Sequence, residues 1–389
     1  MKSHPNWIDR CSELLSRRRE ATLFRQRQIV HSIDSTHIEI AGVRYVNFSS
    51  NDYLGLTHHP KLIQAIESSK ETGSGAAALI SGYTDYHARA EKNLAQWKGT
   101  EAAVLLPSGY QANLAAVQTL AAIGESYPAG VRFLVDKLVH ASLIDAVRAT
   151  ESTMRIFPHN GMAKLLRLLE ESDPNQLQVV LSESIFSMDG DAANLPRLAE
   201  LKQKYPFVLL LDEAHGSGVY GPNGAGYAAE LQLQSAVDVS IVTLSKAIGC
   251  VGGAVCSSDI FRDALVNFGR AYIYSTSIPP MIANCIDAAL DVMREEPQRQ
   301  KRVRDLARRV RAEMSAMKIP EGDSPIIPVI IGSEEATLRA AEELKKQKLL
   351  IVAVRPPTVP AGASRLRITL SCDHSDDEIA TLIRCLKSL

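Results

Sequence analysis

Residues 207–216 read FVLLLDEAHG, in which five apolar residues run without interruption into an aspartate, and a histidine follows three positions later. A short continuous apolar run is typical of a strand buried on both faces, as in a parallel sheet. Ligands of such sheets bind beyond the carboxyl ends of the strands. The stretch therefore predicts that Asp212 and His215 face a ligand site. The alternative is an aspartate that only caps a helix, beside a solvent-facing histidine.

Similar apolar runs recur on both sides of this stretch and alternate with helical patterns between residues 102 and 256. This rhythm predicts an α/β fold in which helices cover a large, mostly parallel sheet of seven strands. Further strands near the C-terminus predict a smaller α+β domain. We expect the large-sheet strands at 102–106, 133–136, 154–157, 179–181, 207–211, 241–244 and 254–256, and the later strands at 326–331, 350–354 and 366–370.

The chain has 389 residues, which is long enough for two or three packed units. We expect an N-terminal arm with a short hairpin over residues 1–50 and a large domain over 51–278. A linking helix and a small domain are expected over 279–389. The helical pattern of the linking segment extends over roughly 279–315 without an obvious end.

The composition narrows the classes of function. The 43 basic and 44 acidic residues give a net charge of −1, so neither nucleic acid nor an anionic membrane is expected as a partner. The six cysteines lack metal-type spacing, and no metal site is expected. No apolar run approaches the roughly 20 residues of a membrane span, and the start MKSHPNWIDRC lacks the apolar region of a signal peptide. We therefore expect a cytoplasmic protein.

Residues 239–249 read VSIVTLSKAIG, in which a buried-looking strand is followed by a lysine, Lys246. Burial lowers the pKa of a lysine, and the neutral amine attacks aldehydes, as attachment of pyridoxal phosphate requires. Asp212 could keep the pyridine nitrogen of that cofactor protonated, and His215 could bond its ring oxygen. Lys246 therefore suggests a pyridoxal-phosphate site. An ordinary solvated loop lysine is the alternative.

Two strand-to-helix junctions could also contact such a cofactor. Ser108-Gly109-Tyr110 opens a helical pattern, and the free amides of a helix N-terminus bind phosphate, although Ser-Gly is often only a cap. His140 lies at a second junction, where an imidazole could stack on a flat ring. An ordinary junction histidine is the alternative there.

The segment 365–370, RLRITL, alternates strictly between polar and apolar residues. Arg365, Arg367 and Thr369 therefore share one face of a predicted strand. An arginine held on a strand can bind a carboxylate through two hydrogen bonds. A solvated surface arginine is the alternative.

Residues 216–221, GSGVYG, match the dinucleotide-binding pattern GxGxxG. That pattern must open a helix, whereas Pro222-Asn223-Gly224 interrupts the chain at once. A nicotinamide or flavin site is therefore not expected here.

Together these segments resemble the fold-type I pyridoxal-phosphate enzymes, and more narrowly the α-oxoamine synthases, over nearly the whole chain. The resemblance rests on the spacing of Asp212, His215 and Lys246 and on the segments 47–56 (NFSSNDYLGL), 186–191 (FSMDGD) and 355–362 (RPPTVPAG). It implies pyridoxal 5'-phosphate, a homodimer, and condensation of L-alanine with pimeloyl-CoA or pimeloyl-acyl-carrier protein. Alternatives are a relative that uses glycine or serine with another acyl-CoA, and a cofactor-binding protein without turnover.

The resemblance also implies a role for each matching residue. Lys246 would hold the cofactor and act as a base, Asp212 would pair with the pyridinium, and His140 would stack on the ring. The other implied contacts are His215 and Ser187 with the ring oxygen, Gly109, Tyr110 and Thr243 with the phosphate, Ser275 and Thr276 with the phosphate of a neighbouring subunit, Arg367 with the amino-acid carboxylate, Arg25 and Thr358 with the acyl group, and Asn51 with the substrate.

Overall fold

The computed structural model describes residues 6–21, 23–315, 317 and 319–389. Its centre is a seven-stranded sheet in the order β4-β10-β9-β8-β7-β5-β6, parallel except that β10 runs antiparallel to both of its neighbours. The predicted α/β fold is confirmed. The strands are β4 (Ala102–Leu106), β5 (Val131–Asp136), β6 (Thr153–Phe157), β7 (Leu177–Glu183), β8 (Val208–Asp212), β9 (Val239–Thr243) and β10 (Gly253–Ser257).

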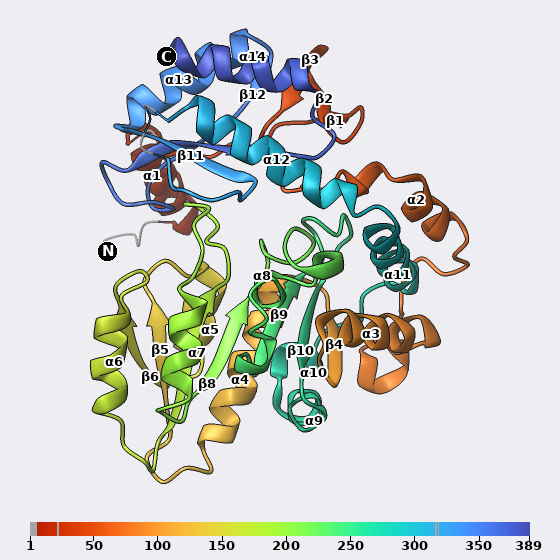
Figure 1. The fold of residues 1–389 in the computed structure, drawn as a ribbon, viewed down its shortest axis with the longest axis vertical. Coiled ribbons are helices and arrows are strands. Elements are labelled where there is room, and N and C mark those ends of the chain that lie inside the picture. Colours follow the sequence, from red (N-terminus) through yellow and green to blue (C-terminus); the bar gives the residue numbers. More distant parts are fainter. Residues whose placement is uncertain (1–5, 22, 316, 318) are drawn as a thin grey trace.

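Helices cover both faces of this sheet (Figure 1). Because side chains alternate along a strand, Phe133 and Val135 pack with α4 and α5 on one face, whereas Leu134 packs with α6 and α7 on the other. Both faces of the sheet are therefore covered by helices, which explains the continuous apolar runs in the sequences of its strands. The helices around the sheet are α2 (Pro60–Glu67), α3 (Asp85–Lys98), α4 (Gly109–Gly124), α5 (Ala141–Arg148), α6 (Met162–Glu170), α7 (Leu195–Lys202), α8 (Tyr227–Glu230), α9 (Asp259–Phe268) and α10 (Arg270–Ile273).

A smaller α+β domain lies above the large sheet in Figure 1. Its antiparallel sheet has the order β11-β14-β13, so β14 is the central strand. Its elements are β11 (Ile326–Gly332), β13 (Val352–Val354), β14 (Ser364–Thr369), α12 (Gln298–Glu313), α13 (Glu334–Lys346) and α14 (Asp376–Lys387).

The N-terminal hairpin joins the C-terminal part of the chain. It contains β1 (His31–Ser32), β2 (His37–Ile40) and β3 (Val43–Asn47), and β3 pairs in parallel with β12 (Leu349–Leu350). The predicted three-part division of the chain stays a prediction. The pairing does show that the first and last parts share one sheet.

The linking segment is two helices rather than the single helix expected over 279–315. α11 (Pro280–Glu295) is followed by Glu296, whose φ and ψ of −121° and 55° are not helical, and Pro297 precedes α12. Proline has no N–H to donate and disfavours helical geometry in the residue before it. The remaining elements are α1 (Trp7–Glu20), η1 (Leu56–His58), η2 (Ala78–Gly82), η3 (Pro222–Gly224) and η4 (Gln234–Ala236).

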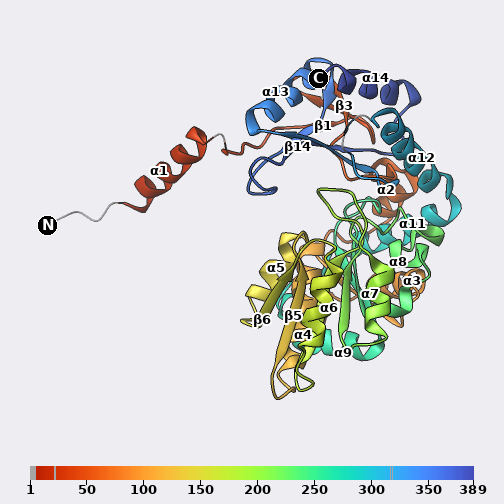
Figure 2. The same ribbon diagram turned by 60° about the vertical axis from the view of Figure 1, so that its left-hand side comes forward.

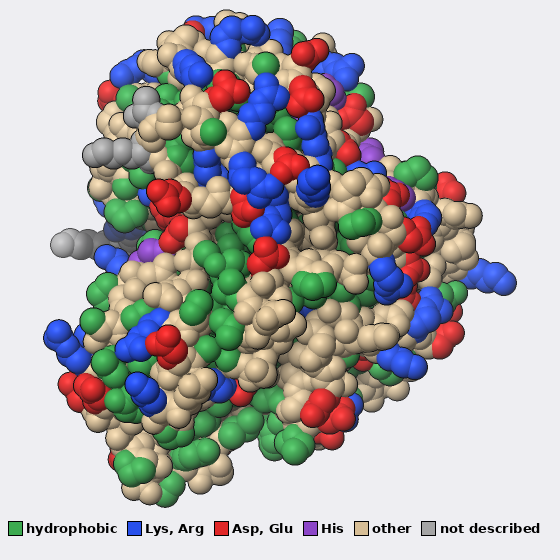
Figure 3. Space-filling view, viewed as in Figure 1, with side chains coloured by type: hydrophobic (Ala, Val, Ile, Leu, Met, Phe, Trp, Pro, Cys, Tyr) green, Lys and Arg blue, Asp and Glu red, His purple; other side chains and the backbone are tan. Residues whose placement is uncertain are grey.

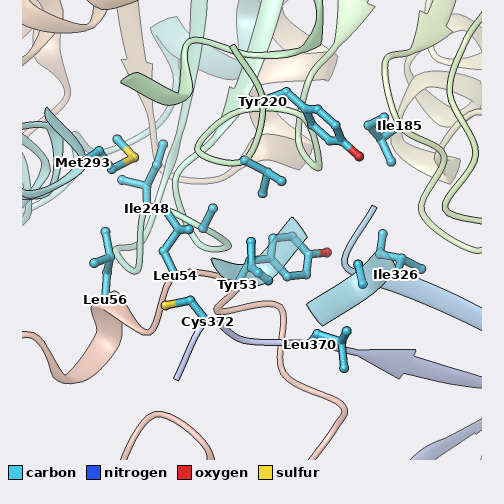
Figure 4. Close-up of a cluster of buried hydrophobic side chains, with 14 of the residues drawn as sticks. Tyr53, Leu54, Leu56, Ile185, Tyr220, Ile248, Met293, Ile326, Leu370 and Cys372 are labelled. Carbon is cyan, nitrogen blue, oxygen red and sulfur yellow. The ribbon is translucent and has the colours of Figure 1, made fainter. Parts of the chain in front are cut away.

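The largest hydrophobic cluster holds the two domains and the segment after the hairpin together. Tyr53 and Leu54 are fully buried in it beside Ile248, Ile326 and Leu370 (Figure 4). Ile248 lies two residues after Lys246, and Ile326 and Leu370 belong to the small domain. The lysine loop is thereby packed against the small domain through the 53–56 segment.

The surface mixes charges of both signs. Figure 3 shows basic side chains interspersed with acidic ones over the face that carries α12. In α12, Arg299, Arg304 and Arg309 pair with Asp373, Glu230 and Asp376. Among the described residues, no helix is both long and apolar enough to cross a membrane.

We predict a pH-dependent contribution to stability from His159, which bonds Asp136 at 3.1 Å and Asp191 at 2.7 Å. Burial by itself lowers the pKa of this imidazole, but the hydrogen bonds to the two carboxylates outweigh burial and raise the pKa to about 10. Because the folded-state pKa lies above the unfolded value of about 6.5, the contribution is complete below about pH 6.5 and is lost as the pH rises towards 10.

Urea unfolding of the wild type and His159→Asn between pH 6 and 10 tests this. The variant should be less stable at pH 6 by about 1.5–3 kcal/mol, and the difference should shrink at high pH. Parallel stability profiles of the two proteins would contradict the assignment.

Candidate active site

Lys246 lies three residues beyond β9, at the carboxyl edge of the large sheet. Its Nζ is 2.8 Å from His215 Nε2. Burial lowers the pKa of this amine to about 8, although the charges of Asp212 and Glu183 act in the opposite direction. A substantial fraction of the amine is therefore neutral and nucleophilic near pH 8.

Asp212 ends β8 and is 3% exposed. Its carboxylate accepts hydrogen bonds from Asn113 Nδ2 at 2.7 Å and from the backbone N–H of Ala214 at 2.9 Å. Asn113 also donates to Ser142 Oγ at 2.9 Å, and that hydroxyl lies 2.7 Å from His140 Nδ1. The carboxylate is thus held in place by α4 and connected to the first turn of α5, which His140 precedes as an exposed N-cap residue.

His215 is buried between Lys246 and Tyr53, whose hydroxyl is 2.6 Å from His215 Nδ1. Burial, followed by the charge of Lys246, holds the pKa of this imidazole well below its ordinary value. Burial likewise raises the pKa of Tyr53 to about 12. Both side chains are therefore uncharged near neutral pH and act as hydrogen-bonding groups.

The start of α4 forms a narrow cradle of backbone amides. Ser108 caps this helix, its Oγ accepting from Gln111 N at 3.1 Å. A Cβ on Gly109 would overlap Thr243 Oγ1, so only glycine allows the helix to approach the end of β9 this closely. Free amides at the start of a 16-residue helix are suited to a phosphate.

Three further residues predicted to contact the phosphate, Tyr110, Ser275 and Thr276, lie in different surroundings. Tyr110 is 45% exposed and donates to Asp145 at 3.0 Å. Ser275 Oγ accepts from Gln111 Nε2 at 3.0 Å within one chain, so its place at this helix does not require a neighbouring subunit. Thr276 is exposed and forms a β-bridge with Ala77.

Arg367 connects the small domain to the site. Its Nε donates to the carbonyl of Ser187 at 2.7 Å and its Nη1 to Asn51 Oδ1 at 3.1 Å, and the residue is 8% exposed. Arg365 is buried as well and forms an ion pair with Asp189. Both arginines lie on the central strand β14, so the solvated-arginine alternative is wrong.

A cavity of about 610 Å³ is lined by Arg367 and by Arg25 and Thr358, the two residues predicted to contact the acyl group. At its wall, Arg25 Nη2 donates to Thr358 Oγ1 at 3.3 Å. Met188 and Val352 add apolar lining. The structure therefore brings Arg25, Thr358 and Arg367 together, with Asn51 bonded to the last of them.

Sequence analysis missed Glu183, the last residue of β7. It lies opposite Asp212 in the parallel register and is 2% exposed. Its Oε2 accepts from Ser187 N at 3.2 Å, whereas its Oε1 is buried without a partner among the described residues. Burial, together with the charge of Asp212, raises the pKa of Glu183 to about 8. The one signal in the sequence was an acid at the end of an apolar run, as at Asp212.

Asn113 and Tyr53 were also missed as site residues. Asn113 lies one turn into α4, and no local pattern shows that it reaches Asp212. Tyr53 lies in the segment 47–56 that carries the resemblance, but its bond to His215 joins positions 162 residues apart.

This set of groups fits pyridoxal phosphate. The aldehyde needs a neutral amine, the pyridine nitrogen needs a carboxylate, and the phosphate needs amide donors. Lys246, Asp212 and the start of α4 offer these three groups.

Comparisons with known proteins agree with this chemistry. Residues 43–386 match the protein family described as aminotransferase class I and II. Relatives described as 8-amino-7-oxononanoate synthase from Cellvibrio japonicus and from an Enterobacter species are each 38% identical over 98% of this chain, covering 96% and 98% of their own lengths.

Two solved structures are also similar. Serine palmitoyltransferase from Sphingomonas wittichii has a TM-score of 0.90 at 26% identity over 98% of both chains. The 8-amino-7-oxononanoate synthase of Francisella tularensis has a TM-score of 0.75 at 25% identity, over 88% of this chain and 97% of its own.

The chain therefore belongs to the class I and II aminotransferase family, with the fold-type I architecture and pyridoxal 5'-phosphate as cofactor. Within that family it falls among the 8-amino-7-oxononanoate synthases.

We predict that cofactor attachment to the cofactor-free protein accelerates with pH and is half-maximal near pH 8. Below its pKa the amine of Lys246 is protonated and cannot attack the aldehyde. Glu183→Gln should move the midpoint to lower pH, because the carboxylate of Glu183 stabilises the charged amine. The absorbance change after addition of pyridoxal phosphate measures this rate. A midpoint at about 10, the value of an ordinary lysine, would show that the amine is not desolvated.

Proposed function

We propose that the chain condenses L-alanine with a pimeloyl thioester, releasing CO2 and forming 8-amino-7-oxononanoate for biotin synthesis. One observation carries this proposal: hydrogen bonds through His215, Tyr53 and Asn51 connect the amine of Lys246 to Arg367, which lines a cavity together with Arg25 and Thr358. The names of the relatives that are 38% identical over nearly the full chain support it.

When bound, pyridoxal phosphate supplies an electron sink for the carbanion that forms at Cα of the amino acid. Asp212 would hold the proton on the ring nitrogen through a charge-assisted hydrogen bond, which contributes about 1.5–3 kcal/mol. Lys246 would hold the cofactor and, when its amine is free, would move the proton at Cα of alanine. A pKa of about 8 suits a base near neutral pH.

Several uncharged or polar groups would orient the ring. His215 and Ser187 would address its oxygen, and the ring of His140 would stack on one face. Gly109, Tyr110 and Thr243 would hold the phosphate at the start of α4.

Arg367 is proposed to bind the carboxylate of alanine. Nε and Nη1 already donate to Ser187 and Asn51, which fixes the plane of the guanidinium. The remaining N–H groups belong to a side chain that lines the cavity. A guanidinium held in this way is suited to a carboxylate.

The cavity favours an acyl chain with a polar end. Arg25 and Thr358 lie at the cavity together with apolar Met188 and Val352, so a pimeloyl group could place its distal carboxylate near Arg25. Acetyl has no second carboxylate and palmitoyl has only hydrocarbon there. A wrong substrate would leave the polar groups without partners, which penalises it.

A homodimer is part of the proposal. Leu79, Ile80 and Tyr274 are 49%, 81% and 73% exposed, and Thr276 is bridged to Ala77 in the same region. Large exposed apolar side chains that gather on one surface are typical of a protein interface. Cytoplasmic location stays a prediction.

Product analysis tests the function. Incubation of the cofactor-loaded protein with L-alanine and pimeloyl-CoA or a pimeloylated carrier protein should give 8-amino-7-oxononanoate by mass spectrometry. Lys246→Ala should give none and should lose the borohydride-reducible link to the cofactor. Equal or faster turnover of glycine with acetyl-CoA would move the chain to another branch of the family.

We predict that Arg367→Ala weakens alanine binding roughly ten- to a hundredfold, the value of a lost charge-assisted bond. Arg365→Ala is the matched control on the same strand, because Arg365 is already paired with Asp189 and should affect alanine binding less. Spectral titration of the cofactor with alanine measures both. A larger loss in the control would make Arg365 the carboxylate anchor.

A further inference from the structure

A lysine and a glutamate form an ion pair inside the large domain, one residue beyond Asp212. Lys98, the last residue of α3, is 5% exposed, and its amine pairs with the carboxylate of Glu213, which is fully buried. Neither residue has a part in the chemistry proposed above. Because the removal of two charges from water is costly, a pair at this position calls for a reason.

Each partner of this pair also holds a backbone group of the segment that leads into α8. The amine of Lys98 donates to the carbonyl of Ala225, and Oε1 of Glu213 accepts from the N–H of Ala228 at 2.9 Å. Figure 2 shows α3 and α8 on the same side of the large domain. A Cβ on Gly226 would overlap the carboxylate of Glu213, so the chain passes the pair as closely as glycine allows.

The pair is attached to the turn that carries two groups of the site. Successive side chains at the end of a strand point in opposite directions. Asp212 bonds Asn113 of α4, whereas Glu213 bonds α3 and α8. The carbonyl of Glu213 accepts from the N–H of Ser217 at 2.8 Å, which closes the turn that contains His215. One side chain of this step therefore serves the site and the next one serves the interior.

The glycine-rich segment 216–226 connects the pair to the lysine loop as well. Gly218 has a φ of +85°, and a Cβ there would overlap Ala247, the residue after Lys246. The N–H of Gly218 donates to the carbonyl of Gly224 at 2.7 Å, two residues before the contact with Glu213. The glycines of this segment therefore serve close packing between the ion pair and the site.

We propose that Lys98 and Glu213 are positioning residues. Their ion pair fixes the turn 212–218 from the side opposite the site, so that the two groups on this turn keep one distance from the amine of Lys246. A gain in stability does not account for the pair, because apolar side chains of similar volume are often as good or better at such a position. The inference rests on the proposed function only where turnover is measured.

The variant K98M/E213Q separates positioning from stability. It replaces the pair with two uncharged side chains of similar size, and the summed charge of the two positions stays zero. The full-length variant should unfold at the same urea concentration as the wild type or at a higher one. Its kcat with alanine and pimeloyl-CoA should nevertheless fall roughly tenfold or more, because small misplacements of reacting groups are costly. The KM for pimeloyl-CoA should stay close to the wild-type value, since neither residue lines the substrate cavity.

Two measurements on the bound cofactor need no turnover. The visible circular dichroism of bound pyridoxal phosphate depends on how the ring is held, and its intensity should fall in K98M/E213Q. The dissociation constant of the cofactor should rise by up to about tenfold, the lower end of the effect of losing one charge-assisted hydrogen bond, here that of Asp212.

Glu91→Gln is the matched control, because Glu91 is a partly buried carboxylate of the same helix that accepts from Leu105 N at 2.8 Å and does not contact the turn. It should keep the wild-type dichroism, cofactor affinity and kcat. Glu213→Gln by itself keeps an acceptor for Ala228 but removes the countercharge of Lys98. It should show the losses of the double variant and should also unfold at a lower urea concentration.

Wild-type dichroism, cofactor affinity and kcat in K98M/E213Q would overturn the inference, because the pair would then matter only to the fold. Equal losses in Glu91→Gln would also overturn it, since any disturbance of α3 would suffice. If the double variant does not fold, Glu213→Gln decides by the same three measurements. If the wild type binds the cofactor but forms no product, the proposed function fails, while dichroism and affinity still decide this inference.

Discussion

The structure depends on keeping one amine buried and still reactive. Burial alone would lower the pKa of the Lys246 amine so far that the amine would stay neutral and would not serve as a base. The carboxylates of Asp212 and Glu183 offset part of that effect and hold the pKa of the amine at about 8. Because β7 and β8 are parallel neighbours, their last residues lie side by side, and both carboxyl groups act on the same amine. The topology of the sheet thus sets the electrostatics of the lysine.

A series of hydrogen bonds carries that arrangement into the small domain. His215 contacts Lys246 and Tyr53, Tyr53 donates to Asn51, and Asn51 accepts from Arg367. The proposed amine and carboxylate-binding groups are therefore fixed relative to each other across the domain boundary. Hydrophobic packing around Tyr53 and Leu54 holds the same segment rigid, so substrate placement depends on the core beneath it as well as on the polar groups.

The sequence was sufficient where the physics is local. Continuous apolar runs located every strand of the large sheet, and the residues after them located Asp212, His215 and Lys246. Glu183 and Asn113 were missed because their function comes from neighbours on other strands and helices. The burial of Arg365 and Arg367 follows from the central place of β14. The helix breaks before Pro297 because of that proline, but in the sequence the helical pattern on both sides outweighed its signal. The contacts of Glu183 and Asn113 and the central place of β14 have no signature within a few residues, whereas Pro297 is a local signal.

The pairing of β3 with β12 has a consequence for synthesis on the ribosome. The hairpin emerges among the first 50 residues, but the strand that completes its sheet is made 300 residues later. Until residue 350 leaves the exit tunnel, the backbone donors and acceptors along one edge of β3 have no strand to satisfy them, and such open edges attract other chains. The nascent protein therefore depends on its last elements to close a sheet that its first elements began.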